Sequence, residues 1–186
     1  TPCVTSSKPD GWAFNSSGDC CEWVGITCEP SSSLRLNNTA RITKLELVNR
    51  GLSGSLSESL GLLDHLRVLN LSNNFILGSI PPSIFNLVHL ETLNLSSNHL
   101  YVEIAHSINS TELRHIRLEK SNFAGAFPAG FGKCALLQQL FLGGNYITGN
   151  IPDDLFHLLE IQVNDLYASL SPTLGNLSSI SLRIDS

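Results

Sequence analysis

The stretch from Leu66 to Pro81 reads L-R-V-L-N-L-S-N-N-F-I-L-G-S-I-P, and its leucine spacing recurs along the chain. The first leucine has counterparts 24 residues away on either side, at Ile42 and Leu90. Repeats of this length are typical of solenoids, in which each unit buries its apolar face only against its neighbours. The sequence therefore predicts an α/β solenoid.

Within each repeat, the spacing L-x-x-L-x-L is typical of a short strand whose leucines point inward while the residues between them face outward. Leu66, Leu69 and Leu71 show this spacing in the best-matching copy. We therefore expect one short parallel strand per 24-residue repeat on the concave face, with a 3-10 or irregular convex side. Stacking of coils should supply the core, at about 1.5–3 kcal/mol per fully buried leucine.

Two polar or small residues recur inside the repeat. The ninth position is asparagine, whose inward amide can satisfy backbone groups of the turn that leaves the strand. The thirteenth position is glycine, because a compact bend favours a residue without Cβ. These residues are Asn74, Asn98 and Asn145, and Gly54, Gly78, Gly125 and Gly149. Val102 and Ser121 interrupt the two series.

The repeat pattern fails beyond His157. We equate Leu142 and Ile161 as the same position of successive coils, although they are only 19 residues apart, and this predicts a deletion of five residues. The expected organisation is a cysteine cap over residues 1–40, about five repeats over 41–158 and a degenerate or truncated last repeat over 159–186.

Composition narrows the possible partners. The 186 residues are 42% hydrophobic and 15% charged, with a net charge of −5. Eleven Lys+Arg against 16 Asp+Glu do not supply the basic stripe that binding to nucleic acid requires. No apolar run approaches the roughly 20 residues needed to cross a bilayer. The sequence predicts no nucleic-acid partner and no membrane span in this chain.

Four of the five cysteines, Cys3, Cys20, Cys21 and Cys28, precede the first repeat, where a solenoid needs a cap over its open end. Adjacent cysteines do not easily pair with each other, so the alternatives are Cys3–Cys20 with Cys21–Cys28, which we favour, or the crossed pairing. A zinc site is disfavoured because the cluster has no histidine and lacks two separated C-x-x-C pairs. Disulfides imply an oxidising, extracellular location.

Sequons for N-glycosylation point to the same compartment. The N-x-S/T triplets begin at Asn15, Asn37, Asn70, Asn94, Asn109 and Asn176. For Asn70 and Asn94, the repeat text L-N-L-S itself produces part of the motif. Secretion is still the interpretation that the six triplets favour.

The cap text C-C-E-W-V-G-I-T-C from Cys20 to Cys28, followed by L-x-G-x-I-P-like text from Ile76 to Pro81, resembles the extracellular leucine-rich repeats of plant receptor kinases, receptor-like proteins and polygalacturonase-inhibiting proteins. Segments 41–47, 52–61, 67–76 and 131–137 further resemble the N-terminal ectodomain of phytosulfokine receptors. The resemblance implies a right-handed leucine-rich-repeat superhelix with an N-terminal disulfide cap. It also implies perception of a short tyrosine-sulfated peptide outside the cell, with a co-receptor kinase as partner and any kinase domain outside this chain.

The hormone pocket of that family is formed by later repeats and an inserted island segment, which this chain lacks. Two other function classes therefore stay open: a secreted, shortened leucine-rich-repeat protein that inhibits ice recrystallisation in cold stress, and a defence protein of the polygalacturonase-inhibitor type. Ice binding requires a regular lattice of small polar side chains. The fifth-position residues are mixed, which favours recognition of a partner; they are Glu46, Asn70, Asn94, Arg117 and Phe141.

The outward strand positions should form a concave sheet on which a peptide or protein ligand binds. A cationic and aromatic cluster in its second half could attract a sulfated or acidic ligand through charge-assisted hydrogen bonds, or it could be merely solvated surface charge. The candidate contacts are Arg114, His115, Arg117, Lys120, Gln139 and Phe141. No G-x-S-x-G elbow, P-loop or H-E-x-x-H motif occurs, so we expect no catalysis, no cofactor and no metal.

Overall fold

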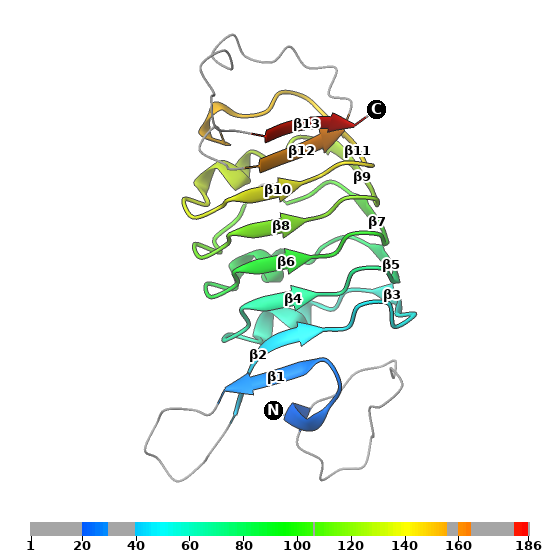
Figure 1. Ribbon diagram of the computed structural model, residues 1–186, viewed down its shortest axis with the longest axis vertical. Helices are drawn as coiled ribbons and strands as arrows, with labels where there is room; N and C mark the ends of the chain where they lie inside the picture. Colours follow the sequence, from blue (N-terminus) through cyan, green and yellow to red (C-terminus); the bar gives the residue numbers. More distant parts are fainter. Residues whose placement is uncertain (1–19, 30–39, 106, 156–159, 165–180, 186) are drawn as a thin grey trace.

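The computed structural model describes residues 20–29, 40–105, 107–155, 160–164 and 181–185, and for the last two ranges it describes the backbone. Successive coils stack along one axis into an elongated solenoid (Figure 1), as the leucine period predicts. Each coil forms hydrogen bonds with the next, for example from the Leu71 N–H to the Asn94 carbonyl at 2.9 Å. The fold therefore depends on contacts between neighbouring coils.

The first sheet has eight strands in the order β1-β2-β4-β6-β8-β10-β12-β13. Adjacent strands from β2 to β13 run parallel, and β1 pairs with β2 antiparallel. The strands are β1 (Ile26–Glu29), β2 (Arg41–Glu46), β4 (Val68–Asn70), β6 (Thr92–Asn94), β8 (His115–Arg117), β10 (Gln139–Phe141), β12 (Glu160–Asn164) and β13 (Ser181–Asp185). Leu69, Leu93 and Ile116 occupy matching register positions, so the apolar side chains form a continuous row.

A second parallel sheet, which the sequence analysis does not anticipate, runs along the side of the solenoid in the order β11-β9-β7-β5-β3 (Figure 1). Its strands are β3 (Ser53–Ser55), β5 (Phe75–Gly78), β7 (His99–Val102), β9 (Asn122–Ala126) and β11 (Tyr146–Thr148). In the described part of the chain, four 3-10 helices complete the coils, as expected for the convex side: η2 (Glu58–Leu62), η3 (Pro82–Asn86), η4 (Ala129–Lys133) and η5 (Asp153–Leu155). A further 3-10 helix, η1 (Cys20–Glu22), lies in the cap.

The core combines the repeated leucines with a few aromatic rings. Leu66, Leu90 and Leu113, the first leucines of three successive coils, are fully buried. Phe85 and Phe131 meet edge to face, with ring centroids 6.4 Å apart, so aromatic packing contributes more than the leucine pattern suggests. Cys134 is a buried free thiol, and burial raises its pKa to about 11. It therefore behaves as a small apolar residue.

The ninth-position asparagines connect successive coils, as the sequence predicts. The Asn98 amide donates to the Leu71 carbonyl at 3.0 Å and to the Leu95 carbonyl at 2.9 Å. Its oxygen accepts a hydrogen bond from the Ile76 N–H at 3.0 Å. In the next coil, Ser121 is buried and its hydroxyl has no hydrogen-bond partner among the described residues. The asparagine series is thus interrupted between the third and fourth coils.

We expect Ser121→Asn to stabilise the protein by about 1 kcal/mol, because the new amide would reach the Leu95 and Leu118 carbonyls in the way that Asn98 and Asn145 reach their counterparts. Chemical denaturation measures this gain. A variant less stable than the wild type would show that the shorter third coil leaves no room for the longer side chain.

The thirteenth position needs a backbone conformation that suits glycine. Gly78 has φ 87° and Gly125 has φ 98°. Val102 occupies the same position of the intervening coil with φ 80°. A β-branched residue in this region carries strain on the order of 1–3 kcal/mol. The exposed side chain of Val102 gains little burial to offset that cost.

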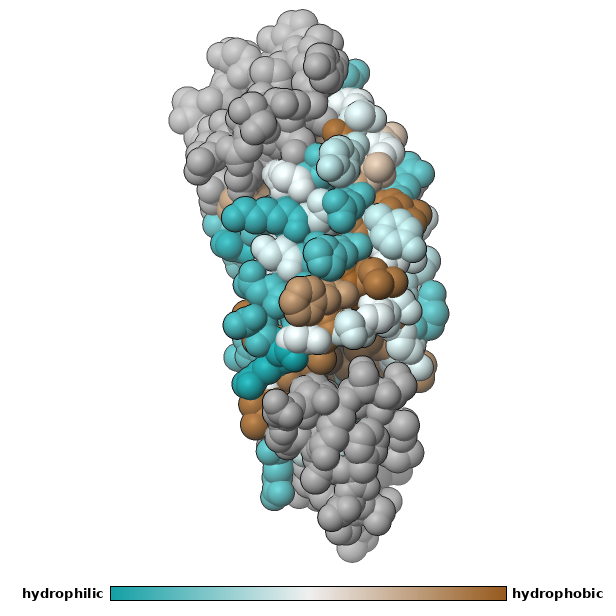
Figure 2. Space-filling model, turned by 90° about the vertical axis from the view of Figure 1, so that its right-hand side faces the viewer, coloured by the Kyte–Doolittle hydropathy of each residue, from teal (hydrophilic) through white to brown (hydrophobic). Residues whose placement is uncertain are grey.

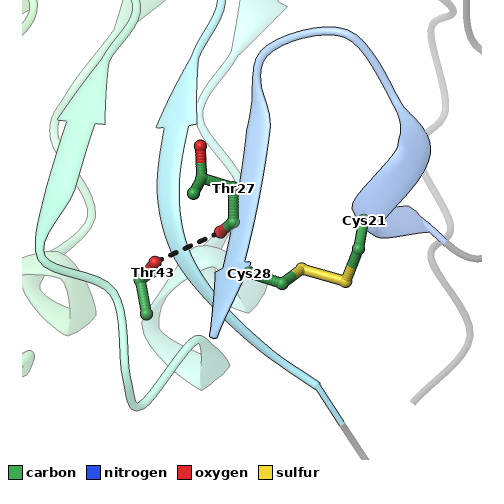
Figure 3. Close-up of a disulfide and its surroundings, with 4 residues drawn as sticks. All are labelled: Cys21, Thr27, Cys28 and Thr43. Carbon is green, nitrogen blue, oxygen red and sulfur yellow. Dashed lines mark hydrogen bonds between the residues drawn. A yellow bond between two sulfur atoms is a disulfide. The ribbon is translucent and has the colours of Figure 1, made fainter. Parts of the chain in front are cut away.

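The N-terminal cap is attached through β1. A disulfide joins Cys21 to Cys28, the pairing favoured over the crossed alternative (Figure 3). Cys20 is also disulfide-bonded, and its predicted partner Cys3 lies outside the described residues. The Thr43 hydroxyl donates to the Thr27 carbonyl at 3.3 Å, and the Glu46 N–H donates to the Gly25 carbonyl at 2.7 Å. These contacts seat the cap on the first coil.

The predicted register beyond His157 is wrong. Ile161 pairs with Leu140 and not with Leu142, so the step between coils is 21 residues instead of 19. Hydrogen bonding to β10 sets this register, and leucine spacing alone does not distinguish the two leucines of the L-x-L pair. Strand β13 then continues the sheet, with Leu182 opposite Ile161.

Candidate functional site

The concave face consists of two columns of outward side chains that run across the parallel strands. The third-position column contains Lys44, Val68, Thr92, His115 and Gln139, and the fifth-position column contains Glu46, Asn70, Asn94, Arg117 and Phe141. Each side chain has its neighbours about 4.8 Å away on the adjacent strands. A ligand lying across the strands would therefore meet one residue of each column per coil.

The structure brings four of the six predicted contact residues together. His115 and Arg117 on β8 lie opposite Gln139 and Phe141 on β10. The two remaining candidates flank β8, since Arg114 precedes it and Lys120 follows it in a left-handed turn conformation with φ 56°. The six residues thus form a central group of four with a cation at either end of β8. We call these six residues the concave cluster.

Phe141 differs from its predicted state. We expect an exposed ring, but the side chain is only 8% exposed. The guanidinium carbon of Arg117 lies over the ring, 4.6 Å from its centroid, and this contact covers the outer face. A cation above an aromatic face contributes about 0.5–2 kcal/mol, depending on desolvation. Phe141 therefore acts as a platform that orients Arg117.

Arg117 differs from two other arginines, Arg41 on β2 and Arg67 directly before β4. Arg41 forms an ion pair with Asp64 at 3.3 Å, and Arg67 forms one with Glu91 at 2.7 Å. Among the residues whose side chains the structure describes, no carboxylate lies within ion-pair distance of Arg117. Its planar set of donors is thus held in place by Phe141 without a carboxylate partner, an arrangement suited to an anionic ligand.

His115 contributes polarity but little charge. Burial lowers its pKa below the ordinary value of 6.5, and the nearby Arg117 and Arg114 lower it further. The imidazole is therefore neutral at pH 7 and can either donate or accept a hydrogen bond. The positive charge of the concave cluster comes from its arginines and lysine.

Glu119 is a neighbour of this cluster that the sequence analysis does not single out. It occupies the seventh position of its coil, where Ser72 and Ser96 are buried in earlier coils. Burial raises the pKa of its carboxyl, with smaller opposing effects from a backbone hydrogen bond and from Arg117 and Lys120. Its Oε2 is buried and has no hydrogen-bond partner in the described part of the chain. The sequence signal was the replacement of a small residue by a larger acidic one.

We expect Glu119→Gln to raise the melting temperature at pH 7 and to leave it nearly unchanged at pH 3. A carboxyl whose pKa is raised in the folded protein binds its proton more tightly there than in the unfolded chain. Its contribution to stability is therefore fully present below the pKa of the unfolded chain and is lost as the pH rises through the pKa of the folded protein. Thermal denaturation across this pH range measures the effect. Glu46→Gln, at an exposed position of the same sheet, is the control, and an equal gain there would contradict the assignment to burial.

Two predicted glycosylation sites lie on the first half of the concave face. The Asn70 oxygen accepts hydrogen bonds from the Ser72 N–H at 3.2 Å and from the Ser72 hydroxyl at 2.8 Å. Asn94 and Ser96 repeat this geometry at 3.1 Å and 2.8 Å. Each sequon is thus folded into a compact turn. Asn109 is exposed, and Asn15, Asn37 and Asn176 lie outside the described residues. Glycosylation stays a prediction.

Other kinds of site find no support in the described ranges. They contain no group of three or more His, Cys, Asp or Glu side chains arranged to hold a metal ion. None of the helices that the structure describes has the length and apolar character that crossing a bilayer requires.

Known proteins that resemble this chain are leucine-rich-repeat proteins, in agreement with the stacked coils of the structure. The Leucine Rich Repeat family model matches residues 65–87, 89–110 and 136–158. Phytosulfokine receptor 1 of Arabidopsis thaliana is 51% identical in an alignment that covers 84% of this chain. The chain is a plant-type leucine-rich-repeat protein. The match confirms the resemblance inferred from the cap and repeat motifs, although this leucine-rich-repeat chain spans only 18% of that receptor.

Solved structures share the same leucine-rich-repeat fold. The crystal structure of PEPR1–AtPEP1 aligns with a TM-score of 0.80 and 28% identity, covering 95% of this chain and 25% of that one. The plant peptide hormone receptor RGFR1 in complex with RGF2 aligns with a TM-score of 0.73 and 25% identity, covering 88% of this chain and 29% of that one. Both matches support the leucine-rich-repeat solenoid as the fold of this chain.

Proposed function

We propose that this chain is the N-terminal part of an extracellular recognition module of the phytosulfokine-receptor type, which perceives a peptide hormone and does no chemistry of its own. The similarity to phytosulfokine receptor 1 and to a peptide hormone receptor of the same fold supports this proposal. By the same resemblance, the module faces the outside of the cell and works with a co-receptor kinase.

The observation that carries the site assignment is the placement of Arg117. The guanidinium of Arg117 lies over the Phe141 ring, whereas Arg41 and Arg67 are paired with carboxylates. A sulfated or carboxylate-bearing peptide would accept charge-assisted hydrogen bonds from Arg117. Neutral His115 and the Gln139 amide lie beside it and offer uncharged hydrogen-bonding groups.

Glycans on Asn70 and Asn94 would direct a ligand to this half of the sheet. Both asparagines lie in the fifth-position column on β4 and β6, before the strands that carry the concave cluster. An attached oligosaccharide would cover the surface around these two strands. The peptide would then contact β8 and β10, where the predicted cationic residues lie.

The test is a titration of a short tyrosine-sulfated peptide against the whole chain, with the heat of binding measured by calorimetry. We expect Arg117→Ala to weaken binding about tenfold or more, because a hydrogen bond to a charged group contributes about 1.5–3 kcal/mol. Lys44→Ala removes a positive charge from the same sheet three coils away and should leave affinity nearly unchanged. Absence of binding, or equal weakening in both variants, would overturn the site assignment.

A further inference from the structure

Two histidines lie side by side on successive coils, at the edge where the chain enters the first sheet. His65 and His89 occupy equivalent positions in the tight turns that lead into β4 and β6, near the tails of these strand arrows in Figure 1. Their ring centroids are 5.9 Å apart, with an interplanar angle of 37°. Coil stacking thus brings together two imidazoles that sequence motifs do not connect.

The turns that carry both histidines are anchored on the core. Leu66 and Leu90, the residues that directly follow the histidines, are fully buried. In each turn the N–H of this leucine donates to a carbonyl three residues earlier, to Leu63 at 2.9 Å and to Leu87 at 3.1 Å. The main chain therefore holds the two imidazoles on adjacent coils, so a ligand that contacts both has little chain to order.

A carboxylate supports the second imidazole. Glu112 occupies the equivalent turn position of the next coil, and its Oε1 lies 3.4 Å from Nδ1 of His89. Histidines that bind a metal through one ring nitrogen usually donate the other N–H to a carboxylate or carbonyl, which fixes the tautomer and makes the binding nitrogen more basic. A neutral His89 that donates from Nδ1 to Glu112 has its lone pair on Nε2, where a metal ion can bind.

The charged side chains that flank the first histidine are already paired. Asp64, directly before it, forms an ion pair with Arg41 at 3.3 Å, and Arg67, two residues after it, forms one with Glu91 at 2.7 Å. Both imidazoles are open to solvent, since the first is exposed and the second has a side chain that is 43% exposed. A cation that approaches the pair would therefore meet arginines whose charge is compensated.

We propose that His65 and His89 bind a divalent transition-metal ion of the Zn²⁺ or Cu²⁺ class, one nitrogen from each, as a clamp between the second and third coils. These ions favour imidazole nitrogen, whereas Mg²⁺ and Ca²⁺ favour oxygen ligands. With metal–nitrogen bonds of about 2.0–2.1 Å, two imidazoles on one tetrahedral ion have ring centroids about 5–6 Å apart. The observed separation of 5.9 Å lies within this range.

The clamp has fewer protein ligands than a permanent zinc site, which usually has three or four. Water completes the coordination, so the ion exchanges with the solution. Because the ligand is the neutral imidazole, protons compete with the metal and binding weakens as the pH falls.

The experiment is a calorimetric titration of Zn²⁺, and separately of Cu²⁺, into the whole chain prepared without a polyhistidine tag. His65→Ala and His89→Ala should each weaken binding by more than about tenfold, because each removes one of the two nitrogen ligands. Glu112→Gln should weaken it by up to about tenfold, because the carboxylate orients a ligand without touching the ion. Mg²⁺ should give no binding heat.

His99→Ala is the matched control. This histidine lies on β7 of the second sheet, on the side of the solenoid that Figure 2 shows, and its ring stacks on Phe75 with centroids 6.0 Å apart. Its loss should leave the affinity for both ions unchanged. A clamp between coils also predicts that Zn²⁺ raises the melting temperature of the wild-type chain and of His99→Ala, but not that of His65→Ala or His89→Ala.

Four results would overturn the proposal. They are absence of binding by the wild-type chain, equal weakening in His99→Ala and His65→Ala, a melting temperature that Zn²⁺ raises equally in all variants, and a stoichiometry of one ion per two chains, which would place the ion between copies. Arg117→Ala, on the concave face, should bind both ions as the wild type does. Failure here therefore leaves the peptide-binding proposal to be decided by its own titration.

Discussion

Replacing Asn98 by alanine is expected to lower the free energy of unfolding by about 3–5 kcal/mol. The substitution removes the hydrogen bonds that the amide donates to the Leu71, Leu95 and Ser96 carbonyls, and it leaves the buried Ile76 N–H without its acceptor. Urea denaturation followed by circular dichroism measures the loss. The side chain is small and polar, so the effect would come from hydrogen bonding more than from lost apolar packing.

Ser121→Ala is the matched control at the same position of the next coil. Its hydroxyl is buried but has no partner among the described residues, so its removal should change stability by less than about 0.5 kcal/mol. If both alanine variants lost the same stability, burial at the ninth position would explain the effect and the hydrogen bonds between coils would not.

The second large effect is expected at the junction between the cap and the first coil. Gly25 has φ 84°, and a Cβ there would overlap the Glu46 carbonyl oxygen and lie 2.8 Å from Leu47 Cδ2. Gly25→Ala should therefore cost about 3–5 kcal/mol, which combines backbone strain with displacement of β1 from β2. Thermal denaturation measures the loss, and limited proteolysis should show cleavage that begins in the cap.

Gly51→Ala separates the two contributions. Gly51 has φ 65°, but nothing lies within 4 Å of a Cβ built there, so only backbone strain of about 1 kcal/mol is expected. Comparable losses in the two variants would show that the cap moves aside freely and that its close contact with β2 contributes little.

Much of the fold is readable from the sequence because the features that determine it repeat at a fixed spacing. Leu66, Leu69 and Asn74 each recur in later coils, so one unit predicts how the next one packs and hydrogen-bonds. The second sheet is different. Its strands are three to five residues long, and main-chain contacts between coils define them, such as the 2.7 Å hydrogen bond from the Phe75 N–H to the Leu52 carbonyl. Side-chain periodicity does not report such bonds.

The candidate site was predictable in position but not in detail. Counting strand positions places His115, Arg117, Gln139 and Phe141 on one face, and the structure puts them on adjacent strands. The burial of Phe141 depends on where the long side chain of Arg117 settles, which spacing alone does not determine. The register of Ile161 was missed for a related reason, since pairing with β10 decides which of two similar leucines is its equivalent.

Side chains at the third and fifth positions stand on a frame that the inward leucines and the asparagines already hold in place. Exchanging one of them, Arg117 for glutamate for instance, would alter the chemistry of the surface while leaving the stacking of coils intact. Ligand preference and thermal resistance should therefore vary separately in a library randomised at these positions. A protein organised in this way can acquire a new ligand through a few point substitutions on its surface, without any change to its core.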